Sequence, residues 1–67
     1  MKTLGEVINQ EREARGMTIR HLSEKTGVPY SALQPCLSGH REFRAPEFFA
    51  VCRFLGIDPI AAFNSVA

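Results

Sequence analysis

Histidine and cysteine, two side chains that often hold metals or perform catalysis, occur only as His21, His40, Cys36 and Cys52. No two of them have the spacing of a recognisable metal-ligand pair, and both cysteines fall at apolar positions of expected helices, which favours buried thiols over ligands. The sequence shows neither a nucleophile–base–orienter set nor a glycine-rich phosphate loop. It therefore predicts no metal, no cofactor, no small-molecule substrate and no enzyme activity.

The stretch from Thr18 to Gly39 predicts two short helices joined by a tight corner. The Thr18 hydroxyl suits a helix N-cap, Gly27 can take a positive φ and end that helix, and Pro29 fits the start of the next one. The apolar stripe of the second helix consists of Leu33, Cys36 and Leu37. This arrangement is a helix-turn-helix, and its second helix has a shape that can enter a DNA major groove.

The segments MTIRHLSEKTGVPYSALQPCLSG and APEFFAVCRFLGIDP resemble the Cro/C1-type (phage-repressor-like, XRE family) helix-turn-helix domains. The resemblance extends without gaps from about Leu4 to Phe63. It implies an all-α, five-helix, lambda-repressor-like bundle, which we expect to form a single domain over residues 1–67. It also implies a sequence-specific transcriptional regulator of the phage or prophage repressor type, which binds a double-stranded DNA operator as a homodimer.

The same resemblance assigns DNA contacts to individual residues. Base-edge contacts carry over to Tyr30, Ser31 and Gln34, where a glutamine amide can pair with adenine and a serine hydroxyl can donate or accept. A phosphate contact is expected from Arg20, which lies near where the family contacts phosphate. Further phosphate contacts are expected from the basic residues of the loop after the motif, His40, Arg41 and Arg44. Two alternatives remain open: the first three residues are simply exposed and polar, or Arg20 forms a surface ion pair with Glu24.

Two positions depart from the family pattern. Pro35 stands in the middle of the second motif helix, where relatives commonly have polar or basic residues, and it cannot donate to the Ser31 carbonyl. We therefore expect that helix to kink or to split into a turn over residues 29–34 and a second turn over residues 35–38. The other departure is Ile19, which replaces a phosphate-contacting glutamine of many relatives.

The remaining segments predict three further helices. One spans residues 3–15 and begins with a capping box in which Glu6 is the second partner. Another spans residues 46–55, and its expected core residues are Phe48, Val51, Cys52 and Leu55. Asp58 and Pro59 fit the N-cap and first position of a short fifth helix that contains Ile60 and Phe63.

Four apolar residues exceed what one small core can bury, and we expect them to form a dimer interface: Phe49, Phe54, Phe63 and Val66. A net charge of only +1 and this aromatic surplus leave open an alternative, a protein-interaction module such as an antitoxin, an antirepressor or an accessory subunit. No apolar run reaches the ~20 residues of a membrane span, and no signal segment opens the chain. A cytoplasmic location is therefore expected by default.

Overall fold

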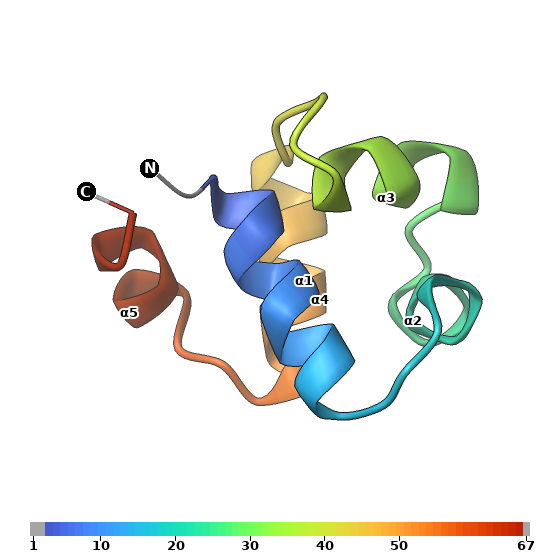
Figure 1. Ribbon diagram of the computed structural model, residues 1–67, viewed down its shortest axis with the longest axis horizontal. Helices are drawn as coiled ribbons and strands as arrows, with labels where there is room; N and C mark the ends of the chain where they lie inside the picture. Colours follow the sequence, from blue (N-terminus) through green and yellow to red (C-terminus); the bar gives the residue numbers. More distant parts are fainter. Residues whose placement is uncertain (1–2, 67) are drawn as a thin grey trace.

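The computed structural model describes residues 3–66 and places them in five helices (Figure 1). These helices are α1 (Leu4–Ala14), α2 (Ile19–Thr26), α3 (Tyr30–Leu37), α4 (Ala45–Leu55) and α5 (Pro59–Asn64). Helices α1 and α4 lie together at the centre, with α2 and α3 packed on one side of them and α5 on the other (Figure 1). Residues 3–66 contain no strand, so the predicted all-α, five-helix fold is confirmed.

Short-range side-chain bonds cap three of the helices, as the sequence predicts. The Thr3 hydroxyl accepts from the Glu6 N–H at 3.1 Å, and the Glu6 carboxylate accepts from the Thr3 N–H at 3.2 Å, which closes the capping box of α1. Thr18 and Asp58 cap α2 and α5, each accepting a backbone N–H at 3.0 Å.

Helix α4 starts differently from the other helices. It begins at Ala45, one residue before the predicted start, and its N-cap residue is Arg44, whose guanidinium has no acceptor atom. The Glu47 carboxylate of the first turn accepts from the Arg44 backbone N–H at 3.0 Å. Half of a capping box is therefore present: the Glu47 side chain, within the helix, satisfies the N–H of the N-cap residue.

The core between the helices is apolar, and the described residues contribute no buried polar or charged side chain to it. Its fully buried side chains are Ile8, Leu22, Leu33, Cys36, Val51 and Cys52. Both cysteines are free and buried, as predicted, and burial raises the pKa of the Cys52 thiol. Within residues 3–66 no cluster of His, Cys, Asp or Glu could hold a metal ion, and none of the helices there could cross a membrane.

Gly5 allows α1 and α3 to approach each other at backbone distance. A Cβ atom at this position would lie 1.7 Å from the carbonyl oxygen of Cys36, a backbone atom that no rotamer change can move. Glycine weakens a helix interior by about 1 kcal/mol relative to alanine. Here the close approach offsets this cost, because it allows the C-terminal half of α3 to pack on α1.

The predicted split at Pro35 is wrong, since α3 is one continuous helix from Tyr30 to Leu37. The proline removes one bond, the one that residue 35 would have donated to the Ser31 carbonyl. The following turn is well bonded, because the Pro35 carbonyl accepts from the His40 N–H at 2.9 Å. Leu33, Cys36 and Leu37 are buried, so both turns of this helix pack against the core.

Candidate nucleic-acid interface

The corner between α2 and α3 turns at Gly27, whose φ of 78° lies in the left-handed region that favours glycine. The Gly27 N–H donates to the Ser23 carbonyl at 3.0 Å, and the Ser23 hydroxyl donates to the Val28 carbonyl at 2.6 Å. Val28 is buried beneath the corner. Bonds on both sides of the glycine therefore fix the direction in which α3 leaves α2.

Helix α3 divides its side chains between the core and solvent. Leu33, Cys36 and Leu37 face inward. The three residues predicted to contact base edges are all exposed: Tyr30, Ser31 and Gln34. Helix α3 lies at the edge of the molecule (Figure 1), and these three polar side chains are exposed to solvent there. The prediction that these residues contact bases remains a prediction.

Arg20 lies over the ring of Tyr30, with its Cζ atom 5.5 Å from the ring centroid. It forms no ion pair with Glu24 within residues 3–66, so that alternative is not realised here. The stacking joins the first turn of α2 to the first residue of α3. A cationic group therefore stands directly beside the polar face.

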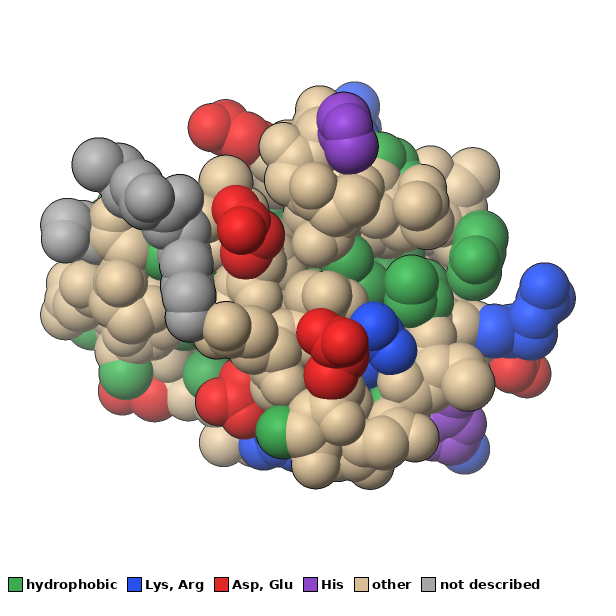
Figure 2. Space-filling model, in the orientation of Figure 1, with side chains coloured by type: hydrophobic (Ala, Val, Ile, Leu, Met, Phe, Trp, Pro, Cys, Tyr) green, Lys and Arg blue, Asp and Glu red, His purple; other side chains and the backbone are tan. Residues whose placement is uncertain are grey.

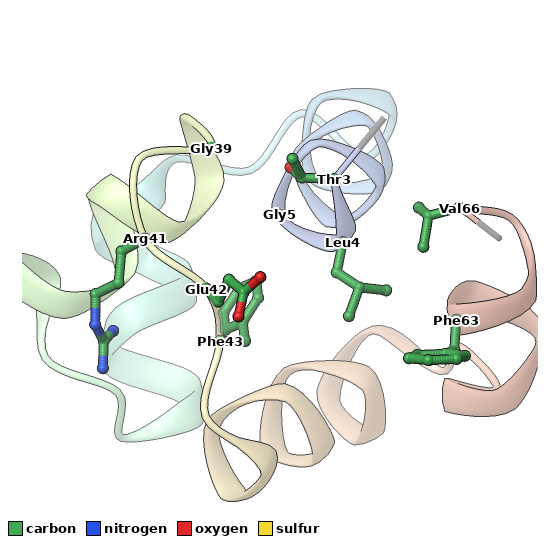
Figure 3. A pocket seen from close by; sticks show the side chains of 9 residues that line it. All are labelled: Thr3, Leu4, Gly5, Gly39, Arg41, Glu42, Phe43, Phe63 and Val66. Atoms are coloured by element: carbon green, nitrogen blue, oxygen red, sulfur yellow. The ribbon is translucent and has the colours of Figure 1, made fainter. Parts of the chain in front are cut away.

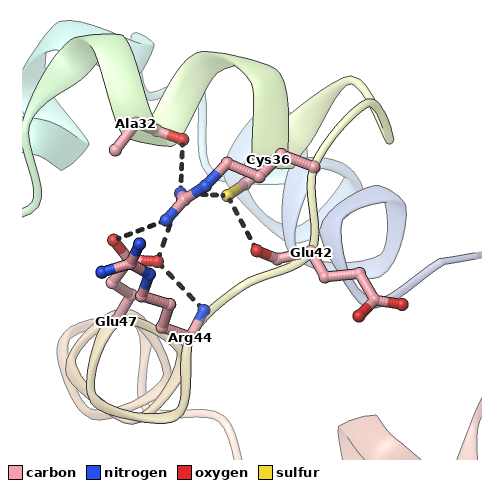
Figure 4. A network of polar contacts seen from close by, with 6 residues as sticks. Ala32, Cys36, Glu42, Arg44 and Glu47 are labelled. Atoms are coloured by element: carbon pink, nitrogen blue, oxygen red, sulfur yellow. Dashed lines mark hydrogen bonds and ion pairs between the residues drawn. The ribbon is translucent and has the colours of Figure 1, made fainter.

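Arg41 is engaged within the chain (Figure 4). Its Nη1 donates to the Ala32 carbonyl at 3.3 Å and to the Cys36 Sγ at 3.1 Å. The same nitrogen lies 3.3 Å from Glu47 Oε1, and Nη2 donates to Oε2 at 3.4 Å. The guanidinium thus links two groups of α3, the Ala32 carbonyl and the Cys36 sulfur, to the Glu47 carboxylate in the first turn of α4.

The carboxylate of Glu47 is charged over an extended pH range because of its donors. The hydrogen bond from the Arg44 N–H, and then the bond from the Arg41 guanidinium, lower the pKa of Glu47 below its ordinary value of 4.5. The Glu47 carboxylate in turn raises the pKa of Arg41. The two groups therefore neutralise each other at pH values above the lowered pKa of Glu47.

Two other predicted phosphate contacts, His40 and Arg44, are exposed in the connection between α3 and α4. The His40 Nδ1 lies 2.9 Å from the Ser38 hydroxyl, which orients the ring near the end of α3. On the face shown in Figure 2, acidic and basic side chains are interspersed, consistent with a net charge of only +1. Whether either residue contacts phosphate remains a prediction.

The family model described as helix-turn-helix matches residues 8–60, which is most of the chain. The chain belongs to the Cro/C1-type helix-turn-helix family. Membership indicates a DNA-binding helix-turn-helix domain of the kind found in transcription regulators. No curated protein and no solved structure matches the chain.

This helix-turn-helix domain also has an apolar groove of ≈ 270 Å³ beside α5, and Phe49 and Phe63 of the predicted dimer interface line it. The other lining residues are Leu4, Phe43, Ala45, Phe48, Pro59 and Ile60. Val66 lines an adjoining pocket together with Phe63 (Figure 3). Phe54 lies elsewhere, with its ring centroid 6.2 Å from that of His21. The structure thus places Phe49, Phe63 and Val66 of the predicted interface beside α5, whereas Phe54 lies away from them.

The sequence did not reveal the roles of three residues in this helix-turn-helix domain: Gly5, Glu47 and Ile60. A glycine in the first turn of an amphipathic helix is a signal of close packing. The three-residue spacing from Arg44 to Glu47 is that of a capping box, but arginine is not a capping residue. The exposure of Ile60 had no sequence signal, because an apolar residue in a short helix is ordinarily a core residue.

Proposed function

We propose that the chain is a sequence-specific transcriptional regulator of the phage or prophage repressor type, which reads its operator with α3 in the major groove. One observation carries this proposal: Tyr30, Ser31 and Gln34 are exposed together on α3 while the opposite side of that helix is buried. A glutamine amide can form two hydrogen bonds with adenine, and a serine hydroxyl can donate or accept. Tyr30 adds a hydroxyl and an aromatic face for a thymine methyl group.

Phosphate contacts in this proposal come from Arg20, His40 and Arg44, whose side chains are exposed around α3. Helix N-termini add free N–H groups and partial positive charge. Few phosphates are neutralised per subunit, because only these three side chains are assigned to them. The salt dependence of binding should therefore be shallow for one subunit and about twice as steep for a dimer.

The dimer in this proposal forms through the groove beside α5. Ile60 and Phe63 are exposed there by 66% and 58%, and Phe49 is 50% exposed. Burying such side chains against a second copy gains free energy in proportion to the apolar area removed from water. Two copies would present their α3 helices to half-sites roughly 34 Å apart, one turn of DNA.

Selection of duplexes from a random-sequence pool by the full chain tests the proposal. We expect enrichment of a palindromic site, and tighter binding to that site than to a scrambled duplex of the same composition. Equal binding to the selected and scrambled duplexes would contradict sequence-specific reading.

A second function, a protein-interaction module on the same fold, is favoured by the apolar groove with its exposed phenylalanines. Chromatography on heparin and on nonspecific DNA at low salt separates the two functions. Retention on both supports the regulator, whereas a chain that flows through both columns supports the interaction module.

A further inference from the structure

We propose that the Arg41–Glu47 pair is a clamp that positions α3 for DNA, and that Arg41 acts as a positioning residue rather than as a phosphate contact. This inference rests on the proposed function, since the helix that it positions is the one that reads bases. It differs from the phosphate contact that the sequence analysis expects of Arg41 as a basic residue of the loop after the motif.

The first argument is where the Arg41 guanidinium lies. It donates to the Ala32 carbonyl and the Cys36 sulfur of α3 at 3.3 and 3.1 Å, and it meets the Glu47 carboxylate of α4 at 3.3 Å (Figure 4). Helix α3 packs mainly on α1 and α2. The guanidinium therefore supplies a polar link from the Ala32–Cys36 turn of α3 to the first turn of α4.

The second argument is a local weakness in α3. Pro35 has no N–H, so the Ser31 carbonyl lacks the bond that position 35 would otherwise donate. The turn with the missing bond is the one that holds Ser31 and Gln34. Arg41 adds a bond to the neighbouring Ala32 carbonyl, and its backbone N–H donates to the Pro35 carbonyl at 3.3 Å. The clamp therefore strengthens α3 next to the weakened turn.

The third argument is electrostatic. Glu47 is anchored at the start of α4 by the Arg44 N–H at 3.0 Å, and both of its oxygens meet the Arg41 guanidinium. A phosphate would have to displace this carboxylate in order to pair with Arg41. Because the pair is neutral, it attracts a phosphate far less than a free arginine does.

Glu47→Gln distinguishes the two alternatives for Arg41, phosphate contact or clamp, because they predict opposite changes in DNA affinity. The amide oxygen can still accept from the Arg44 N–H, but the negative charge that holds the Arg41 guanidinium is lost. If Arg41 contacts phosphate, removing a nearby anion leaves DNA affinity unchanged or raises it. If Arg41 is a clamp, the affinity for the duplex selected by the unaltered chain falls, by at least about fivefold.

Glu42→Gln is the matched control, because it removes an equal charge from the connection that leads into α4. The Glu42 side chain is exposed and takes part in no ion pair within residues 3–66. We expect unchanged or slightly tighter binding in this control. Unfolding curves of each variant show whether it is fully folded in the assay, so that lost affinity is not mistaken for lost folding.

The salt dependence of binding gives a second readout that general destabilisation does not change. Arg44→Ala should lower the slope of log affinity against log salt by about 1 per subunit, whereas Arg41→Ala should weaken binding with the slope preserved. Arg41→Lys should restore binding only in part, because an ammonium has no second nitrogen to donate to Glu47 Oε2 as Arg41 Nη2 does.

Tighter or unchanged binding of Glu47→Gln, or a slope lowered by Arg41→Ala, would overturn the clamp. An unaltered chain that selects no duplex would instead contradict the proposed function. Amide hydrogen exchange in the free protein then decides whether the pair holds α3. Faster exchange at Leu33 and Gln34 in Glu47→Gln supports the clamp, and unchanged exchange overturns it.

Discussion

Two outer faces of this domain differ in what they present to solvent. The outer face of α3 carries Tyr30, Ser31 and Gln34, whereas the groove beside α5 carries Ile60 and Phe63. Hydroxyl and amide groups form hydrogen bonds with water as well as with a partner, but apolar side chains gain free energy only by being covered. The α3 face therefore suits a polar partner, and the groove suits another apolar surface.

The difference shows that a small bundle can separate recognition from assembly. The two faces lie on opposite sides of the central α1 and α4 (Figure 1), so a change on one face should have little direct effect on the other. Under the proposed function, substitutions on α3 alter which sequence is bound, while substitutions in the groove alter how many copies bind.

The largest effect is expected where α3 is seated on the body of the domain. Gly5→Ala should lower the free energy of unfolding by about 3 kcal/mol or more, since its Cβ would lie 1.7 Å from the Cys36 carbonyl oxygen. Helix propensity alone predicts the opposite sign, a gain of about 1 kcal/mol. Denaturant unfolding measures the difference. A Gly5→Ala variant with a free energy of unfolding equal to or greater than that of the unaltered chain would contradict the close packing.

The next effect concerns the groove. Phe63→Lys should weaken self-association by about 2 kcal/mol, because a charged side chain would replace the ring that a second copy covers. Sedimentation equilibrium measures the change. Phe54→Lys is the control, since Phe54 lies beside His21 and outside the groove. Equal dimerisation of the Phe63 variant and the unaltered chain would place the interface elsewhere.

A smaller effect is expected within α3 itself. Pro35→Ala should raise the free energy of unfolding by about 1–2 kcal/mol, because residue 35 regains an N–H that can donate to the Ser31 carbonyl. The greater conformational entropy of the unfolded chain without this proline offsets part of that gain. Pro29→Ala is the control, because an N-terminal position has no bond to regain. Destabilisation by Pro35→Ala would show that the proline ring contributes packing that outweighs the missing bond.

The smallest effect is a change of stability with pH. The pKa of Glu47 is lower in the folded chain than its ordinary value of 4.5. The charged carboxylate therefore stabilises the fold above that value, and this contribution is lost as the pH falls through the folded-state pKa. Thermal unfolding of Glu47→Gln should show a smaller loss of Tm on acidification than the unaltered chain. A Glu42→Gln variant should keep the original acid dependence.

The sequence predicted the parts of the fold that depend on neighbouring residues. Thr18, Gly27 and Asp58 act as caps or corners within a few residues of their partners, so their types alone indicate their conformations. The inward stripe of α3 was predicted for a similar reason, because helical spacing selects one face. The exposure of Tyr30 and Gln34 follows from the same periodicity.

The parts that the sequence did not predict depend on packing between helices. Gly5 weakens a helix locally, and its use becomes apparent only when the Cys36 carbonyl is placed beside it. Arg41 was expected to contact phosphate as a basic residue of the loop after the motif, and the sequence did not indicate that the fold brings Glu47 within reach of it. Pro35 was expected to split α3, but burial of the surrounding stripe keeps the helix continuous.

The most direct test of base reading by α3 is the sequence preference of Gln34→Ala, measured over all single-base variants of the duplex that the unaltered chain selects. We expect discrimination to fall by about 1–3 kcal/mol at one base pair of each half-site, with preferences elsewhere retained. Asn64→Ala, which removes an exposed amide from α5, should change no preference. A Gln34→Ala variant with the preferences of the unaltered chain at every position would contradict the account.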